Sequence, residues 1–272
     1  LFFVETGANQ RAGGVLYDRE GSSFSLADAR AYPWNEILGD AGWFHTTGIA
    51  AAVSRVAAEA TLGAVRTARA SGVPVSCDLN FRRKLWRWDP AIEPGELARR
   101  TLSEILSSAD VAMGNPVDLA HVAGVEFRGN AAEGGADLEA TQGVAQAFGR
   151  RFPTVRWVAV TLREGCSANH NRWGAMLFRT ADATAFVAPT DHGVYAPFEI
   201  ANIVDRLGAG DAFAGALIYA LQTPELADPN QAVRFAVAAS CLAHSIKGDF
   251  NFCTRAEVEA LMEGSSGGNV AR

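Results

Sequence analysis

The chain has 272 residues, 49% of them hydrophobic and 20% charged, which is ordinary globular usage and excludes a largely disordered protein. The formal net charge is −6 and Lys and Arg form no long run, which excludes nucleic acid and anionic membrane surfaces as the main partners. No apolar stretch approaches the ~18 residues that a membrane span requires.

Short apolar runs alternate with longer segments of helical spacing along the chain. The runs predict strands at 2–4, 15–17, 43–45, 73–77, 111–113, 158–161, 185–187 and 200–204. The helical spacing predicts helices at 51–70, 94–107, 138–150, 212–221, 229–245 and 255–262. The alternation indicates βαβ units, and hence a doubly wound, mostly parallel α/β sheet with helices on both faces.

The first 25 residues differ from the rest because two strand-like runs follow one another without a helix. A glycine-rich segment, 7–14, joins the two runs, so we expect a small β-element outside the main sheet. We therefore predict two parts, residues 1–25 and an α/β core of residues 26–272.

The most informative segment, 203–217, has the sequence IVDRLGAGDAFAGAL. A predicted strand ends here, a glycine-rich turn follows, and an apolar helix begins. Backbone N–H groups at a helix start have no partners within the helix, so they can bind a phosphate or a developing anion. Gly208 and Gly210 leave room for its close approach, and Asp211 can accept a proton from a hydroxyl group. The alternative interpretation is a tight turn with Asp211 as an ordinary N-cap.

This segment resembles the DTxGAGD motif of the ribokinase or PfkB family of carbohydrate kinases, with Arg206 where threonine is common. The resemblance implies a ribokinase-like fold in which residues 1–25 contribute to a β-lid. It also implies that Gly208, Ala209 and Gly210 form the anion hole for the transferred phosphoryl group. Asp211 would then be the catalytic base.

Within that family the chain looks most similar to 2-dehydro-3-deoxygluconate kinases. Four segments are similar: VLYDR at 15–19, DLNFR at 78–82, TLREG at 161–165 and GDFN at 248–251. An acid sugar needs cations, and the resemblance offers Arg19 and Arg82 for its carboxylate, since a guanidinium group pairs with a carboxylate through two hydrogen bonds. It also offers Tyr17 and Asp249 as contacts to the sugar, and places Phe2 where such kinases often have tyrosine.

The resemblance further implies a site for ATP and Mg²⁺. Asn115 and Asp118 resemble the family's NxxE motif, and Asp118 would act on Mg²⁺ through water. The alternative for this pair is a helix N-cap. Thr161 and Gly165 match the nucleotide side of the cleft, with a plain turn glycine as the alternative for Gly165. Asp205 would help to organise the Mg²⁺ and phosphate region.

These observations predict an ATP-dependent kinase that phosphorylates 2-dehydro-3-deoxy-D-gluconate to its 6-phosphate. The alternatives are a kinase of the same fold for fructose or another deoxy-ketogluconate isomer, and a non-catalytic sugar or nucleotide sensor. Because related lids pack in pairs, we expect a homo-oligomer. The four cysteines are too widely spaced for a metal site or a disulfide framework, which indicates a reducing cytoplasm.

Overall fold

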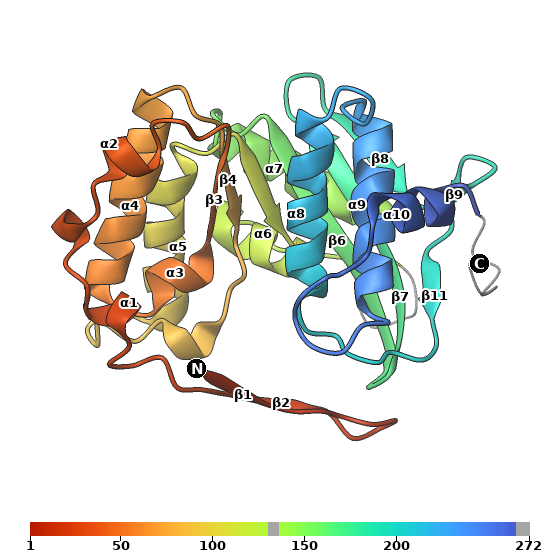
Figure 1. Cartoon of the computed structure of the whole chain (residues 1–272), viewed down its shortest axis with the longest axis horizontal. Helices are drawn as coiled ribbons and strands as arrows, with labels where there is room; N and C mark the ends of the chain where they lie inside the picture. Colours follow the sequence, from red (N-terminus) through yellow and green to blue (C-terminus); the bar gives the residue numbers. More distant parts are fainter. Residues whose placement is uncertain (130–135, 265–272) are drawn as a thin grey trace.

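The computed structural model describes residues 1–129 and 136–264, and its centre is a seven-stranded sheet (Figure 1). The strands follow the spatial order β11 (Phe198–Ile200), β7 (His170–Arg179), β6 (Trp157–Ser167), β5 (Val111–Gly114), β4 (Val75–Asp78) and β3 (Phe44–Thr47), with β8 (Thr184–Ala188) also paired to β7. Strands β3 to β6 are parallel, whereas β7, β8 and β11 add antiparallel pairs. The predicted mostly parallel α/β sheet is confirmed.

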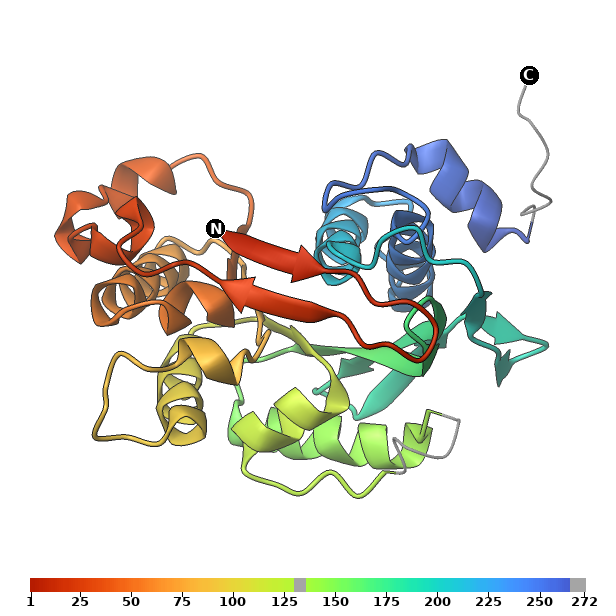
Figure 2. The same cartoon turned by 90° about the horizontal axis from the view of Figure 1, so that it is seen from below.

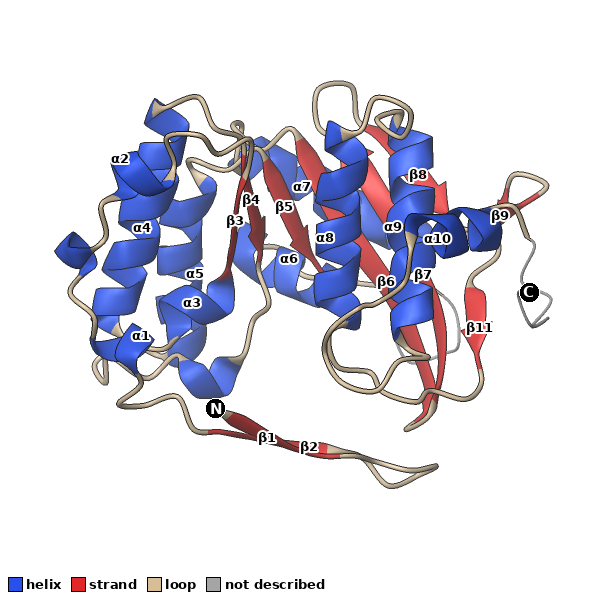
Figure 3. Ribbon diagram, viewed as in Figure 1, coloured by secondary structure: helices blue, strands red, loops and turns tan. Residues whose placement is uncertain are grey.

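Helices cover both faces of this sheet (Figure 3). One face is covered by α4 (Arg55–Ala70), α5 (Pro94–Leu106), α6 (Pro116–Ala123) and α7 (Leu138–Arg151). The other face is covered by α8 (Ala209–Gln222) and α9 (Pro229–Ala243), with α10 (Arg255–Met262) packed against α9. Shorter helices precede them in the chain: α1 (Ser23–Leu26), α2 (Trp34–Ile37) and α3 (Gly48–Ala52).

The two cores follow from the alternation of side chains along each strand. On β5, Ala112 packs into the core under α4 to α7, while its neighbours Val111 and Met113 pack against α8 and α9. All three side chains are almost fully buried, which explains why β5 is apolar at every position.

The hairpin of β1 (Phe2–Glu5) and β2 (Gly14–Tyr17) forms a separate two-stranded sheet, as expected for a small β-element outside the main sheet. It lies below the sheet in Figure 1, and seen from below it runs across the middle of the molecule (Figure 2), where Ala168 N–H donates to the carbonyl of Asn9 (2.8 Å) between its two strands. A second small sheet pairs β9 (Thr190–Asp191) with β10 (Val194–Tyr195).

Three expectations about single elements were wrong. The predicted helix 51–70 is interrupted, because Ser54 between α3 and α4 is extended and caps α4, its hydroxyl oxygen accepting the N–H of Ala57 (3.1 Å). The predicted strand 200–204 ends at Ile200, and the apolar residues that follow form a loop in which Val204 N–H donates to the carbonyl of His244 (2.9 Å). Strand β6 continues to Ser167 instead of ending near Thr161, because its partner β7, which was not predicted, pairs with it over ten residues.

None of the helices in the described part of the chain is long and apolar enough to cross a lipid bilayer.

Candidate active site

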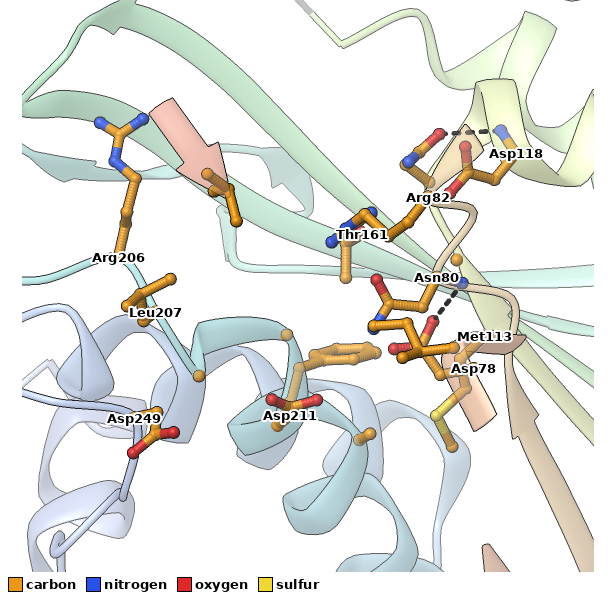
Figure 4. Close-up of a pocket in the computed structure, with 18 of the residues that line it drawn as sticks. Asp78, Asn80, Arg82, Met113, Asp118, Thr161, Arg206, Leu207, Asp211 and Asp249 are labelled. Atoms are coloured by element: carbon orange, nitrogen blue, oxygen red, sulfur yellow. Dashed lines mark hydrogen bonds between the residues drawn. The ribbon is translucent and has the colours of Figure 1, made fainter. Parts of the chain in front are cut away.

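A cavity of about 350 Å³ lies at the carboxyl ends of β4 and β5, against the first turn of α8. Ligands bind at this edge of an open α/β sheet because the strands end there and the helices begin. Figure 4 shows part of its lining. Ten of the predicted site residues line it: Tyr17, Arg19, Arg82, Asn115, Asp118, Thr161, Gly208, Gly210, Asp211 and Asp249. Three others, Ala209, Asp205 and Gly165, are not part of this lining.

The start of α8 forms one wall of the cavity. Gly208 is the N-cap of the helix and has a φ of 74°, a left-handed conformation that glycine adopts without strain. Asp211 lies in the first turn, exposed to the cavity, and makes no capping hydrogen bond. The N-cap alternative for Asp211 is therefore wrong, and its carboxylate is available to a ligand. Ala209 is buried, and its carbonyl accepts a hydrogen bond from the buried hydroxyl of Ser240 (2.6 Å).

Asp205 holds the loop in front of α8. Its Oδ1 accepts hydrogen bonds from the backbone N–H groups of Arg206 (2.8 Å) and Leu207 (3.1 Å). Its Oδ2 accepts one from the N–H of Gly248 (3.1 Å), on the loop that continues to Asp249. Both oxygens of Asp205 thus accept backbone N–H groups, and together these hydrogen bonds connect the loop before α8 to the loop that contains Gly248.

The end of β4 and the loop after it bring two further polar residues into the cavity, namely Asp78, the last residue of the strand, and Asn80. Asp78 Oδ1 accepts the N–H of Asn80 (3.1 Å), which has a positive φ of 37°. Arg82 follows on the same loop, exposed, with Nη1 donating to the carbonyl of Phe81 (3.3 Å). The sequence analysis selected only Arg82 from this segment. Sequence reasoning could have selected Asp78 and Asn80 as well, because they lie at the end of a strand that is buried on both faces.

The Asp78 carboxyl lies in surroundings that favour its protonated form. Burial raises its pKa to about 7, and the negative charge of Asp211 contributes to the same shift. The N–H of Asn80 and the charge of Arg82 oppose the shift. The cavity therefore contains one carboxylate exposed at a helix start and one buried carboxyl whose charge depends on pH near neutrality.

Asn115 and Asp118 open helix α6. Asn115 is its N-cap, with Oδ1 accepting the N–H of Asp118 (2.9 Å). The capping alternative thus describes Asn115, although the residue also lines the cavity. Asp118 is buried, and its Oδ2 accepts the N–H of Phe81 (3.2 Å) on the loop that bears Arg82. Burial raises the pKa of Asp118, and the N–H of Phe81 and the charge of Arg82 partly offset this effect.

The hairpin supplies the other side of the cavity. Phe2 pairs with Tyr17 across the two strands, and both side chains line the cavity together with Val15 and Arg19. The Arg19 guanidinium group lies over the rings of Phe2 (5.6 Å) and Tyr17 (5.8 Å), which are cation–π contacts. Its buried Nε has no hydrogen-bond partner among the described residues. The guanidinium group of Arg19 is therefore positioned by the two rings and not by a hydrogen bond from Nε.

Thr161 and Gly165 lie on β6, four residues apart. Thr161 lines the cavity and also a second one of about 490 Å³, whereas Gly165 lines only the second. Gly165 pairs with Asn171 of β7 and is part of the strand, so the alternative of a plain turn glycine is wrong.

In the described part of the chain no three His, Cys, Asp or Glu side chains gather in a way that could hold a metal ion.

Comparison with known proteins extends these observations. The sequence matches the pfkB family carbohydrate kinase model over residues 15–255. A 2-dehydro-3-deoxygalactonokinase of Haloferax volcanii is 28% identical over 269 residues, which cover 98% of this chain and 71% of that protein.

Two solved structures are similar throughout the chain. A 2-dehydro-3-deoxygluconokinase from Thermotoga maritima is 35% identical, with a TM-score of 0.83, and the match covers 97% of this chain and 72% of that one. A putative 2-keto-3-deoxygluconate kinase from Enterococcus faecalis is 25% identical, with a TM-score of 0.81, and the match covers 100% and 74%. The chain thus belongs to the pfkB family of carbohydrate kinases, and its activity is that of a sugar kinase.

Proposed function

We propose that the protein transfers the γ-phosphoryl group of ATP to the 6-hydroxyl group of 2-dehydro-3-deoxy-D-gluconate. The observation that supports this most is the convergence in one cavity of Asp211, the glycine-rich start of α8, and the two cations Arg19 and Arg82. A sugar acid has a carboxylate with which guanidinium groups can pair through two charge-assisted hydrogen bonds, whereas a neutral sugar has none.

Asp211 is the base in this proposal. It accepts the proton of the sugar hydroxyl as the hydroxyl oxygen forms its bond to the γ-phosphorus and the bond to the bridging oxygen of ADP breaks. The N–H groups after Gly208 stabilise the negative charge of the transferred group, and Gly210 offers open space where a Cβ would otherwise project. Mg²⁺ bound with the nucleotide neutralises phosphate charge, and Asn115 and Asp118 are the residues that would hold it.

In this assignment the sugar carboxylate is bound by Arg19 and Arg82. The hydroxyl groups of the sugar are bound by Tyr17 and Asp249. The acceptor is thereby oriented, which matters because phosphoryl transfer depends mainly on positioning and charge stabilisation. The isomer 2-dehydro-3-deoxygalactonate is the second candidate, supported by the similarity to the Haloferax volcanii enzyme. The two acids differ at one hydroxyl group only, so the same arginines serve either.

ADP release against a panel of sugars tests the proposal. The panel contains the two 2-dehydro-3-deoxy acids, gluconate, fructose and ribose, each with ATP and Mg²⁺. We expect turnover with a 2-dehydro-3-deoxy acid at a kcat/KM at least about tenfold above that with any neutral sugar. Faster turnover with fructose would contradict the acid substrate, and ATP binding without turnover on any sugar would favour a sensor.

We also propose that residues 1–25 act as part of a β-lid and that two copies of the chain pair through it. Side chains alternate along the hairpin: Phe2 and Tyr17 face the cavity, while Phe3 and Leu16 form the next cross-strand pair. Phe3 is 55% and Leu16 68% exposed. A second copy of this hairpin would cover these apolar side chains, which an isolated two-stranded sheet leaves in water.

A further inference from the structure

Two arginines, Arg163 and Arg206, lie close together between the two cavities that adjoin at Thr161. Arg163 is on β6 and lines the cavity of about 490 Å³, while Arg206 is on the loop before α8 and lines the cavity of about 350 Å³. Thr161, Asn115 and Asp118 line both, so the two cavities are direct neighbours. A ligand that fills one can extend into the other.

Both guanidinium groups are held by neutral acceptors of the β6–β7 hairpin. Arg206 Nη2 donates to the backbone carbonyl of Ala168, in the turn between the strands. Arg163 Nε donates to Oδ1 of Asn171 (3.3 Å) when the Asn171 amide is oriented with its nitrogen donating to the carbonyl of His170 (3.1 Å). The Asn171 side chain is buried and fixed. These partners set the positions of the two cations without cancelling their charge.

No carboxylate compensates the pair within residues 1–129 and 136–264. Neither Arg163 nor Arg206 forms a salt bridge there, whereas the neighbouring Arg172 contacts both Glu164 (3.7 Å) and Glu199 (3.8 Å). Burial lowers the pKa of Arg163, and the positive charge of Arg206 lowers it further. Two like charges held near each other repel, so a bound anion would stabilise this arrangement.

The position of the pair indicates which anion it serves. Arg206 is two residues before Gly208, and its side chain points away from Asp211 (Figure 4). Arg206 and Arg82 lie well apart in the same view, so the pair is separate from the cation offered to the sugar acid. A phosphoryl donor whose last phosphate lies at the start of α8 must extend its other phosphates away from the acceptor.

We propose that Arg163 and Arg206 form a clamp for the α- and β-phosphates of the nucleoside triphosphate. The assignment rests on the proposed function, because it takes the donor to be a nucleotide. Guanidinium groups suit this role, since their planar forks match phosphate oxygens and stay charged. Two fixed positive charges on these phosphates would also stabilise the negative charge that develops on ADP as the γ-phosphoryl group leaves.

The test measures affinities for adenosine, AMP, ADP and ATP by calorimetry in Arg163→Gln and Arg206→Gln, with inorganic tripolyphosphate as a probe without a base. Glutamine keeps an N–H donor for the neutral acceptor and removes the charge. We expect adenosine to bind equally well and ADP, ATP and tripolyphosphate to bind about tenfold or more weakly in each variant. Arg163→Lys should restore part of the loss, because it restores the charge without the fork.

Arg172→Gln is the matched control, because that arginine lies on the same hairpin but is paired with carboxylates. It should leave every nucleotide affinity unchanged. Equal losses for adenosine and ATP would overturn the clamp, because they would show a structural role, and so would a loss confined to the sugar acid.

The outcomes separate this inference from the proposed function. If the wild-type protein releases ADP with a sugar acid while both variants keep its affinity for ADP, only the clamp fails. If the variants lose affinity with each added phosphate while the wild type phosphorylates no sugar acid, the clamp stands and the acceptor assignment fails.

Discussion

The backbone of Asp249 lies directly against Gly208. A Cβ at Gly208 would be only 2.2 Å from the carbonyl oxygen of Asp249. The contact joins the N-cap of α8 to another residue that lines the cavity, on the loop after Gly248. The glycine is therefore required twice, for its positive φ and for this approach.

Gly208→Ala should reduce both stability and activity. The substitution places a methyl group against backbone and imposes a left-handed φ on alanine, so either the start of α8 or the Asp249 loop must move. We expect the free energy of unfolding to fall by about 1–3 kcal/mol and kcat to fall at least about tenfold. Urea unfolding and initial rates measure these effects. Gly143→Ala, at a helical position with open space, is the control, and equal effects of the two substitutions would contradict the argument.

Asp211→Asn should abolish most turnover while ATP still binds. The amide keeps the size and polarity of the side chain but cannot accept the proton, so kcat should fall by about a hundredfold or more. Single-turnover kinetics and a separate measurement of ATP affinity check the two parts. Turnover near the wild-type rate would refute the assignment of Asp211 as the base.

Arg82→Ala should weaken the binding of a sugar acid more than the binding of a neutral sugar. Loss of a charge-assisted hydrogen bond costs about 1.5–3 kcal/mol, which is about 10- to 100-fold in KM. Arg83→Ala is the control, because Arg83 pairs with Glu93 and does not line the cavity. If the acid and the neutral sugar lose affinity equally, Arg82 does not bind the carboxylate.

Asp78→Asn should change how stability depends on pH. The carboxyl has an ordinary pKa of 3.8 in the unfolded chain and about 7 in the folded one. Between these values the folded state holds a proton that the unfolded state releases, so the free energy of unfolding falls as pH rises through this window. Asparagine has no such proton and keeps the acceptor for the Asn80 N–H. From pH 4 to pH 8 the wild type should therefore lose more free energy of unfolding than the variant does. The difference between the two losses should be a few kcal/mol at most.

Urea unfolding at several pH values, in EDTA, measures that difference for Asp78→Asn. Parallel profiles for variant and wild type would show that Asp78 titrates normally.

Leu16→Lys should separate the copies if the hairpins pair. A lysine on the outward face cannot be buried without a partner, so light scattering at micromolar concentration should show the mass of one chain for the variant and a multiple of it for the wild type. Val194→Lys, on the exposed strand β10, is the control and should leave the mass unchanged. A wild-type mass of one chain would refute the pairing.

Much of the fold was predictable because it depends on residues that are neighbours in sequence. The segment 203–211 contains its own turn and helix start, so the sequence indicated both, although it placed the strand before them too late. Val204 and Asp205 donate to the carbonyl of His244 instead of to a neighbouring strand, and only the structure places His244 beside them. Strand β7 begins with His170 and Arg172, whose carboxylate partners are on other strands, and this polar start obscured it.

The site was less predictable where it depends on register. Asp78 and Asp211 line the same cavity because β4 pairs with β5, in the register Asp78 to Met113, beneath the first turn of α8. No local sequence pattern predicts that these two residues lie near each other. The proximity of the two like charges of Arg163 and Arg206 was equally unpredictable, since one residue is on a strand and the other on a loop 43 positions later.

The carboxylate of Asp205 determines where this site can adapt to a new acceptor. Its hydrogen bonds connect the loop before α8 to Gly248, next to Asp249, so these two loops are held together. An acceptor of another size must then be accommodated by the hairpin and by the loop that bears Arg82. Attempts to redesign the substrate range should therefore begin with residues 15–19 and 80–82, and leave the start of α8 unchanged.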